Sequence, residues 1–588
     1  MPDISALNGT AIDNVAEFDG LTVTAAAPAF LLDTYTGAAA AYSVRKLRSA
    51  YVGSCMRVRE DGTDTETDIG FDANGDLDTA AIGTHCGSNN GFVVTWYEQS
   101  TNGRDIEQPT AGSPSLQPKI YDGTTQSVVT DGTSSIPAIY FDGSNALGSS
   151  SFTTVSQPLT VFHSLTLTQA FGGTKYIWSL QGFSGGVNNM ADNGTKWKYW
   201  YGGSLDRNVG VSGIGQHLLT SLADGTDSTV WQNGSMVIEG RQDAGSVGMD
   251  QIYLGGWNST INQFDGYINE WIIYPTDQDA AGNRSGIEEN INSEYLIYQP
   301  TDAPTSGLLY DYGSATGGTD AAAAYSVRQL SDKAVICMRI RRDMGAGNPG
   351  DDDETNIGFD ANGDLDTQAI SDFCGTGTGF VTRWWDQSVN GNHADQPVGG
   401  TGSNSLQPQI YNGLEVITEN GKPALDFDGT NDVLISPTMT VTDGELLQSA
   451  VFVADANAAG VVSCDSSPVR VAQTIVFQST TLLRLLTFNS SGGIDSSVAA
   501  TPNATGTQTL ATSQILSGQG EVFVDGSGTL AGTFNVRTDA TTIQIAKATP
   551  FGSYFDGRVQ EVLHWPSQQT NRTGIETNID NYFQIPGM

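Results

Sequence analysis

Positively charged side chains are scarce in this chain. Its 588 residues include 26 lysines and arginines against 65 aspartates and glutamates, which gives a formal net charge of −39. A field of that sign repels phosphate backbones and anionic lipid surfaces, so binding to nucleic acid or to an acidic membrane surface is disfavoured. Such a surface suits salty or divalent-rich surroundings, where counterions screen its self-repulsion, although the charge can also serve solubility alone.

Long apolar segments are also missing. No apolar run approaches the roughly 20 residues that a helix needs to cross a bilayer, so we expect no membrane insertion. Residues 1–24 have neither a cationic region nor an apolar stretch, and they do not resemble a secretory signal. An extracellular protein of this kind would leave the cell as a mature form, through a dedicated secretion system or in a particle released by lysis.

Cysteine is rare, with five residues in the chain. Four of them occupy equivalent places in the two halves, Cys55 with Cys86 and Cys337 with Cys374, while Cys464 is left over. One disulfide in each half and buried free thiols are both compatible with this pattern. The sequence has no C-x-x-C motif and no Cys/His cluster, so a cysteine-based metal site is disfavoured.

Glycine, in contrast, is abundant, with 70 residues. Many of them follow Asp, Asn or Ser in pairs that supply the positive-φ positions of tight turns. Between these turns, segments such as 159–167 and 228–234 alternate apolar and polar side chains, as half-buried strands do. The sequence therefore predicts an all-β fold of antiparallel two-sheet sandwiches.

Helix signals are few. Residues 38–48 are one candidate for a short helix, and residues 278–295 are another, because apolar side chains there recur at i, i+4 and i+8. We expect each half of the chain to close with a short helix docked on its sandwich. The matching apolar faces are formed by Ile287, Ile291 and Tyr295 in the first half and by Ile575, Ile579 and Phe583 in the second.

Two long parts of the chain repeat each other. Residues 69–79 recur unchanged as residues 357–367, and the offset between matching motifs stays between roughly 283 and 291. A repeat of that length predicts domain duplication and excludes a short solenoid unit. We expect an N-terminal anchoring strip (1–28), module 1 (29–300) and module 2 (301–588). Further matching segments are 38–45 with 321–328, 96–100 with 384–388, 115–121 with 405–411, 264–270 with 555–561, and 283–288 with 571–576.

The order of these motifs resembles known families. Ala-Tyr-Ser-Val-Arg (41–45), Asp-Ile-Gly-Phe (68–71) and Trp-Tyr-Glu-Gln-Ser-Thr-Asn-Gly (96–103) together resemble the sandwich domain of fungal-type alpha-L-arabinofuranosidase B. The closing Phe-Asp-Gly-x-(Ile/Val)-x-Glu motif is similar to the last strand of concanavalin-A-like (laminin-G-like) domains. This resemblance covers most of the chain beyond residue 30 and implies two tandem jelly-roll, concanavalin-A-like modules. Similar modules occur in structural proteins of marine tailed phages, and residues 7–22 resemble the leader of phage tail and fibre proteins.

The arabinofuranosidase family carries an adjacent Cys-Cys pair and a nucleophile segment, and neither is found here, so we assign no catalytic residue. Glycoside hydrolysis needs two carboxylates, and the acidic positions repeated in both modules are Glu270 with Glu561 and Glu98 with Asp386. For the first pair the alternative role is a hydrogen bond to a neighbouring strand or loop, and for the second it is a turn contact. No histidine recurs between the modules, which excludes a repeated catalytic triad.

Side chains with oxygen atoms stand at every second residue of one loop in each module, as hard cations prefer. The pattern departs from an EF-hand because Gly75 and Gly363 occupy its fourth position, and Gly83 and Ser371 replace the bidentate glutamate. Calcium binding and a plain Asn-Gly turn are both open interpretations, and calcium is the one cofactor that the sequence suggests. The candidate ligands are Asp72, Asn74, Asp76 and Asp78 in module 1 and Asp360, Asn362, Asp364 and Asp366 in module 2.

The densest aromatic run lies at residues 197–201. Alternation along a strand puts Trp197, Tyr199 and Tyr201 on one face and Trp200 on the other. Exposed rings of this kind stack on sugars, whereas core packing and a subunit contact are the alternatives. The equivalent segment of module 2, residues 482–488, has no such run, so the two modules differ on this surface.

These features together predict a non-enzymatic phage virion protein at the particle surface: a tail fibre, an appendage or a capsid-decorating component. Its partners would be other virion proteins bound through the N-terminal strip, a host-surface glycan or a neighbouring subunit, and copies of itself in a homo-oligomer. The alternatives are a secreted carbohydrate-active enzyme of arabinofuranosidase type and a bacterial surface adhesin.

Overall fold

The computed structural model describes residues 30–588 with short gaps, and before residue 30 it describes only the backbone of four two-residue strands, β1 (Ala6–Leu7), β2 (Thr10–Ala11), β3 (Glu17–Phe18) and β4 (Leu21–Thr22). The gaps are 109–113, 132–135, 170–174, 182–186, 193–195, 202–204, 210–213, 238–242, 247, 259–261, 317–319, 346–347, 349–350, 397–405, 442–445, 457–458, 467–469, 480–481, 489–493, 502–503, 517–518, 534–538, 549–552, 567–568 and 570.

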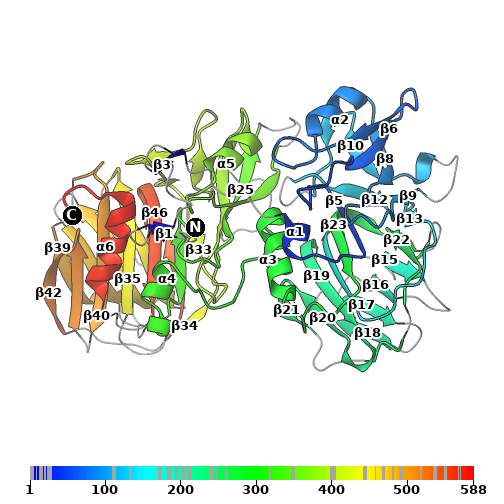
Figure 1. Cartoon of the computed structure of the whole chain (residues 1–588). Helices are drawn as coiled ribbons and strands as arrows, with labels where there is room; N and C mark the ends of the chain where they lie inside the picture. Colours follow the sequence, from blue (N-terminus) through cyan, green and yellow to red (C-terminus); the bar gives the residue numbers. More distant parts are fainter. Residues whose placement is uncertain are drawn as a thin grey trace. The chain divides into compact units, whose positions relative to one another are not determined.

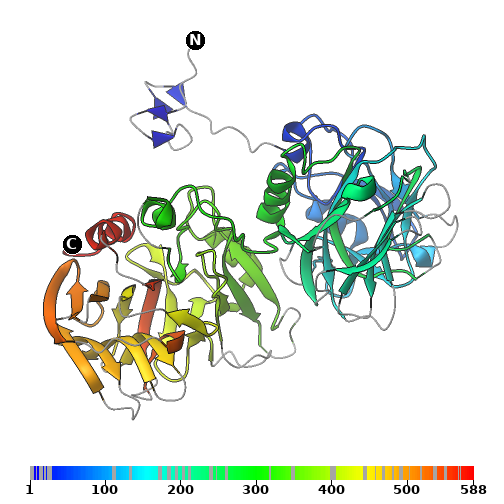
Figure 2. The same cartoon turned by 90° about the horizontal axis from the view of Figure 1, so that it is seen from below.

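The chain forms two compact units, which keep the names module 1 (Met1–Asp131 with Ile136–Glu294) and module 2 (295–588). Both consist mainly of antiparallel strands with few helices (Figure 1 and Figure 2). The all-β prediction is therefore confirmed. No helix in the described part of the chain is long and apolar enough to cross a membrane.

Module 1 has two layers of strands whose buried side chains meet. In the first layer the closing strand β23 pairs with β14 along one edge and with β5 and β12 along the other. The second layer runs from β9 and β13 through β22 and β15 to β18. Strand β8 joins the layers because it pairs with both β9 and β10.

The elements of module 1 are α1 (Leu31–Thr34), β5 (Ala40–Ser43), β6 (Met56–Glu60), β7 (Glu66–Ile69), α2 (Thr79–Cys86), β8 (Gly91–Trp96), β9 (Ile106–Glu107), η2 (Pro114–Leu116), β10 (Lys119–Asp122), β11 (Ser127–Val128), β12 (Ile139–Asp142), β13 (Leu147–Ser149), β14 (Leu159–Leu167), β15 (Lys175–Gln181), β16 (Val187–Asp192), β17 (Lys196–Tyr201), β18 (Leu205–Val209), β19 (Gly215–Ala223), η3 (Gly225–Asp227), β20 (Thr229–Gln232), β21 (Ser235–Met236), β22 (Gln251–Leu254), β23 (Asp265–Tyr274) and α3 (Arg284–Tyr295).

Module 2 repeats this topology, with its closing strand β46 between β35 on one edge and β24 and β32 on the other. Its elements are α4 (Leu308–Asp311), η4 (Ser314–Thr316), β24 (Ala323–Ser326), β25 (Ile336–Asp343), β26 (Glu354–Gly358), α5 (Thr367–Cys374), β27 (Thr378–Trp384), β28 (Ala394–Asp395), β29 (Gln409–Tyr411), β30 (Thr418–Glu419), β31 (Lys422–Pro423), β32 (Leu425–Asp428), β33 (Leu434–Ile435), β34 (Met439–Val441), β35 (Leu446–Ala454), β36 (Ala459–Ser466), β37 (Arg470–Ser479), β38 (Leu482–Phe488), β39 (Ile494–Ala500), β40 (Thr509–Leu516), β41 (Gln519–Val524), β42 (Ser527–Thr533), β43 (Asp539–Ile545), β44 (Lys547–Ala548), β45 (Ser553–Tyr554), β46 (Asp556–Trp565) and α6 (Arg572–Phe583).

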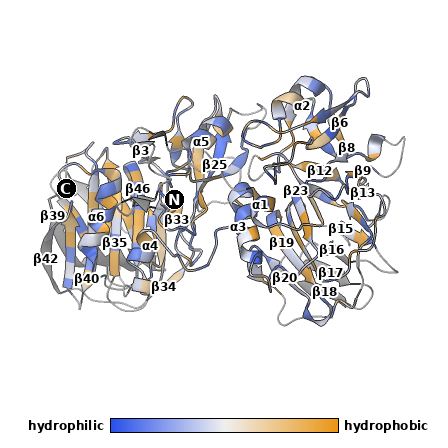
Figure 3. Ribbon diagram, viewed as in Figure 1, coloured by the Kyte–Doolittle hydropathy of each residue, from blue (hydrophilic) through white to orange (hydrophobic). Residues whose placement is uncertain are grey.

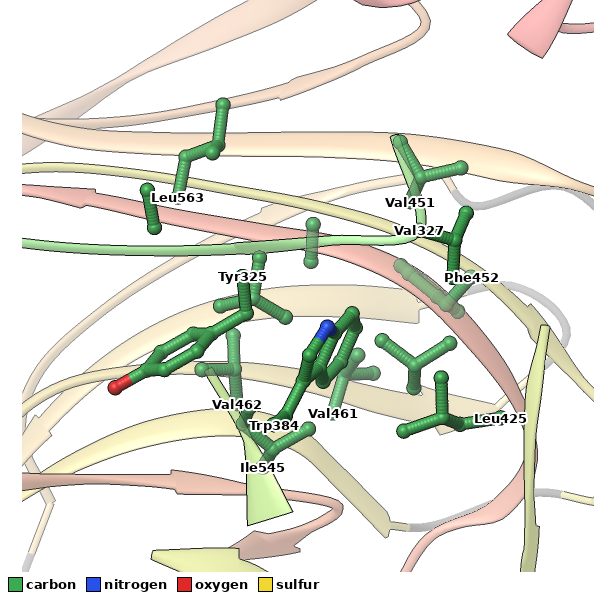
Figure 4. Close-up of a cluster of buried hydrophobic side chains, with 14 of the residues drawn as sticks. Tyr325, Val327, Trp384, Leu425, Val451, Phe452, Val461, Val462, Ile545 and Leu563 are labelled. Atoms are coloured by element: carbon green, nitrogen blue, oxygen red, sulfur yellow. The ribbon is translucent and has the colours of Figure 1, made fainter. Parts of the chain in front are cut away.

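Hydrophobic residues lie along the strands of both modules (Figure 3). A buried Tyr–Trp pair recurs at the same place in each core, with ring centroids 6.0 Å apart: Tyr42 with Trp96 and Tyr325 with Trp384. Figure 4 shows Trp384 among aliphatic side chains of module 2. Each tryptophan also donates its indole N–H to the carbonyl that follows the tyrosine, which satisfies the one polar atom of the ring.

The closing helices lie where the sequence indicates. All six predicted apolar face residues, three in α3 and three in α6, are fully buried. Helix α3 begins at Arg284 and not near residue 278, because Gly282 adopts a φ of +74° and residues 278–282 form turns. The other predicted helix, 38–48, is wrong. Residues Ala40–Ser43 form strand β5, whose four side chains are all buried, so packing against β23 overrides the helix propensity of alanine.

All five cysteines are buried free thiols, which decides between the two interpretations of their spacing. The Sγ of Cys55 lies 3.3 Å from the carbonyl oxygen of Ser43, and the Sγ of Cys337 lies 3.2 Å from that of Ser326. Burial raises the pKa of Cys86 and of Cys374 to about 11. These thiols therefore act as small core side chains.

Candidate functional site

The glutamates of the closing strands are held inside the fold. Glu270 accepts hydrogen bonds from Ser43 Oγ at 2.7 Å and from Arg45 Nε at 2.9 Å. Arg45 also donates to Asn290 Oδ1 of α3 at 2.9 Å. Module 2 repeats the arrangement through the equivalent residues Ser326, Arg328, Glu561 and Asn578. Because the exposed fraction of each glutamate side chain is at most 1%, these residues tie the first strand and the closing helix to the closing strand.

The second repeated acidic position organises the loop after β8 in module 1 and after β27 in module 2. Glu98 accepts the backbone N–H groups of Asn102 and Gly103 at 3.0 and 3.1 Å. Asp386 accepts those of Ala324, Ser388 and Asn392 at 2.8–2.9 Å. Burial raises the pKa of Asp386 to about 6 despite these bonds. Both carboxylates are therefore taken up by the turn contacts that the sequence suggested as an alternative to catalysis.

The candidate calcium loops contain Asx-type turns. Asp72 Oδ1 accepts the N–H groups of Asn74, Gly75 and Asp76 at 2.8, 3.0 and 3.0 Å. Asp360 Oδ1 does the same in module 2 for Asn362 and Asp364, both at 2.9 Å. The glycines Gly75 and Gly363 have φ values of +96° and +78°, which an Asn-Gly turn requires.

Three of the four remaining acidic residues of these loops have other partners. Asp78 caps α2 by accepting the Ala81 N–H at 2.8 Å, and Asp366 caps α5 in the same way. Asp364 accepts the Tyr582 hydroxyl at 2.6 Å. Among the side chains that the structure describes, no three of His, Cys, Asp or Glu are grouped as they would be around a metal ion. The turn interpretation thus accounts for these loops, and calcium binding stays a prediction.

The aromatic run forms strand β17, which lies between β16 and β18 in the second layer of module 1. Its counterpart β38 lies between β37 and β39, so the two segments are equivalent in topology. The side chains of Trp197, Tyr199, Trp200 and Tyr201 lie outside the described residues, and their role as a ligand platform stays a prediction.

A cavity of about 530 Å³ opens in module 1 next to α1. Its walls come from α1, from the residues on either side of β5, and from the loop between β8 and β9. Two arginines, Arg48 and Arg104, line it together with the hydroxyl residues Thr36, Ser100 and Thr101. Val155 and Pro275 add an apolar side.

Module 2 has a smaller cavity, of about 70 Å³, at the equivalent place. Its lining includes Leu309, Ala321 and Ser388, which correspond to Leu32, Ala38 and Ser100 of module 1. No arginine or lysine lines it. The two modules therefore share the position of the cavity but differ in its size and charge.

Sequence reasoning missed this site. Neither Arg48 nor Arg104 belongs to a recognisable motif, and each stands where the repeat breaks, opposite Ser331 and Asn392 of module 2. The signal that could have identified these two arginines is a difference in charge between aligned positions of the two modules.

The sequence matches no family model, and no curated protein is significantly similar to it. Among solved structures, similarity is found to a GH54 α-L-arabinofuranosidase (12% identity, 68% of this chain and 95% of that one, TM-score 0.38). It is also found to domains LG4-5 of the mouse laminin α1 chain (11%, 71% and 86%, TM-score 0.22) and to a pentraxin of Limulus polyphemus (14%, 27% and 83%, TM-score 0.22). Likeness at this level says nothing about what this chain binds or catalyses, and none of the three is a virion protein.

Proposed function

We propose that this chain is a non-catalytic binding protein of the virion surface, a tail fibre, an appendage or a capsid-decorating component. Its modules would bind a host-surface glycan or a neighbouring subunit, and residues 1–28 would attach it to the particle. The proposal that the chain is non-catalytic rests on the hydrogen bonds and ion pairs of the acidic residues that are repeated in both modules. In both modules they are engaged in ion pairs or backbone hydrogen bonds that build the fold.

This engagement argues against glycoside hydrolysis at those positions. A glycosidase needs one carboxyl that gives up a proton to the leaving group and a second that acts as nucleophile or base, both facing the substrate. Asp386 has a raised pKa, as a general acid requires, but its oxygens accept three backbone N–H groups and it faces the interior of its loop. Because Asp386 has a raised pKa but no access to a substrate, we assign it a structural role.

The attachment role of residues 1–28 rests on the resemblance of residues 7–22 to phage leaders. The test is light scattering on the full-length chain and on a chain that begins at residue 29. We expect an oligomer that becomes a monomer on truncation. A monomer in both cases, of 62.1 kDa for the full-length chain and lighter by 28 residues for the truncated one, would contradict the attachment role.

The same preparations test the absence of catalysis. We expect no release of nitrophenol from 4-nitrophenyl α-L-arabinofuranoside above the rate in buffer. Release that Glu98→Gln or Asp386→Asn abolishes, while circular dichroism shows an unchanged fold, would overturn the non-catalytic assignment and favour the enzyme alternative.

A further inference from the structure

The module 1 cavity has a positive charge at two positions where module 2 has neutral side chains. Arg48 of module 1 corresponds to Ser331, and Arg104 corresponds to Asn392. The neighbouring framework is kept, because Asn102 and its counterpart Asn390 both donate to the carbonyls of the alanines that precede the first strand. The arginines are thus additions to a conserved frame.

The backbone contact of Arg104 does not depend on its charge. Its Nη1 donates to the Ala39 carbonyl at 2.7 Å, and in module 2 the neutral Asn392 donates to the equivalent Ala322 carbonyl at 2.8 Å. The guanidinium lies 4.2 Å from the ring centroid of Phe152, which holds it in place. Since an asparagine makes the same backbone contact, that contact does not require the positive charge of Arg104.

Neither arginine forms an ion pair with a described carboxylate, although Asp33 and Glu98 lie near enough for their charges to interact with Arg48 and Arg104 respectively. Within the described part of the chain, no carboxylate forms an ion pair with Arg48 or Arg104, although 65 acidic residues are present. Asp33 is the one acidic residue that lines the cavity, and its Oδ2 accepts the Ser49 N–H at 3.0 Å. Hydrogen bonds from Ser49, with smaller contributions from the charges of Arg48 and Lys46, lower the pKa of Asp33. Two unpaired guanidinium groups in one cavity leave donors available for an external anion.

The difference in size has a cause in the sequence. In module 2 seven residues, 314–320, separate Gly313 from Ala321, where the single Gly37 separates Thr36 from Ala38 in module 1. Three residues of this insertion, Ser314, Ala315 and Asp320, line the smaller cavity. Without the insertion the cavity of module 1 reaches about 530 Å³, within the roughly 300–1,000 Å³ of small-molecule sites.

We propose that the cavity of module 1 binds an anionic saccharide, with Arg48 and Arg104 on its carboxylate or sulfate group. Planar guanidinium groups match both anions because each offers paired oxygen acceptors. The hydroxyls of Thr36, Ser100 and Thr101 suit the hydroxyl groups of a sugar, and Val155 and Pro275 suit its apolar face. This inference rests on the proposed binding function and names the ligand class of that function.

The test is an array of neutral, uronate-containing and sulfated oligosaccharides, probed with the full-length chain and with the variant Arg48→Ser, Arg104→Asn. Both substitutions install residues that module 2 carries, so the fold and the Ala39 hydrogen bond are expected to persist. We expect the wild type to retain anionic glycans. Whether it prefers the uronate-containing or the sulfated probes shows which of the two anionic groups, carboxylate or sulfate, the cavity binds. The dissociation constant of the best probe, measured by calorimetry, should rise at least about tenfold in the variant, because each lost charge-assisted pair contributes on that scale.

The reciprocal variant Ser331→Arg, Asn392→Arg is the matched control, because it adds the same charge beside the small cavity. We expect it to leave anionic retention unchanged. Equal retention of anionic glycans by the wild type and the Ser/Asn variant, or retention of no anionic glycan, would overturn the proposal. Retention of neutral glycans alone would overturn it while leaving the proposed binding function intact. Cleavage of a retained glycan would instead contradict the non-catalytic assignment, whether or not retention depends on Arg48 and Arg104.

Discussion

Buried carboxylates of this chain differ in whether a positive charge accompanies them. Glu561 is paired with Arg328 at 2.8 Å, whereas Asp432 is 4% exposed and has the Asp428 N–H as its hydrogen-bond donor at 3.1 Å. Burial, reinforced by the charges of Asp428 and Asp426, raises the pKa of Asp432 to about 7. The two residues therefore predict opposite responses to removal of their charge.

Glu561→Gln should destabilise module 2. It leaves the Arg328 guanidinium buried without a counter-charge, which costs about 3 kcal/mol in comparable pairs. Denaturant unfolding measures the effect. The control is Asp68→Asn, which breaks the Arg57 pair whose side chains are 42% and 43% exposed and should cost less than about 1 kcal/mol. Equal effects of the two variants would contradict a structural role for the buried pair.

Asp432→Asn should stabilise the protein at high pH. The pKa in the folded chain is raised above its unfolded value, so the stability of the wild type is complete below about pH 4 and is lost as the pH rises through about 7. An asparagine at this position does not titrate, so it loses no stability as the pH rises. In module 1 the contact equivalent to Asp428–Asp432 is already made by an asparagine, because Asn145 accepts the Asp142 N–H at 3.2 Å.

We expect a gain of about 1–2 kcal/mol at pH 8, after allowance for solvent screening, and no gain at pH 4. Thermal unfolding across this pH range measures it. Asn145→Asp is the reciprocal control and should lose stability above pH 5. A pH-independent effect of Asp432→Asn would show that Asp432 titrates normally in the folded chain.

At the scale of single elements, local sequence patterns predicted the secondary structure correctly where the tertiary packing favoured the same element. The faces of α3 and α6 were readable because apolar residues at i, i+4 and i+8 lie on one side of any helix. The alanine-rich segment 38–48 was misjudged because its small side chains suit a strand covered on both faces as well as they suit a helix. Only the register with β23 separates these two outcomes.

Helix α2 offers a test of the candidate calcium loop of module 1. Asp78→Ala removes the side-chain cap of α2 and should lower stability by about 1 kcal/mol with or without calcium. Asn74→Ala is the control, because the exposed Asn74 contributes its backbone N–H to the turn and its substitution should be nearly neutral. Thermal unfolding with EDTA and with calcium measures both. A calcium-dependent rise in Tm that both variants abolish would establish the loop as a calcium site.

At the scale of the whole molecule, duplication explains which features are shared and which are particular. Residues that both modules keep in the same contacts, such as the Arg–Glu pair and the Tyr–Trp pair, build the sandwich. The modules differ in the aromatic content of strands β17 and β38, in the arginines of the two cavities and in the length of the loop before the first strand. Function is therefore expected where the repeat breaks.

The sequence alone determined the strand-rich class, the duplication and the apolar faces of the closing helices, because turn pairs, repeats and periodicity are local patterns. The tertiary structure decided the rest. Glu270 lies beside Arg45 although 225 residues separate them, and Arg48 and Arg104 share a cavity although they come from different loops. Such neighbours follow from strand pairing across the sheets, which no local pattern encodes.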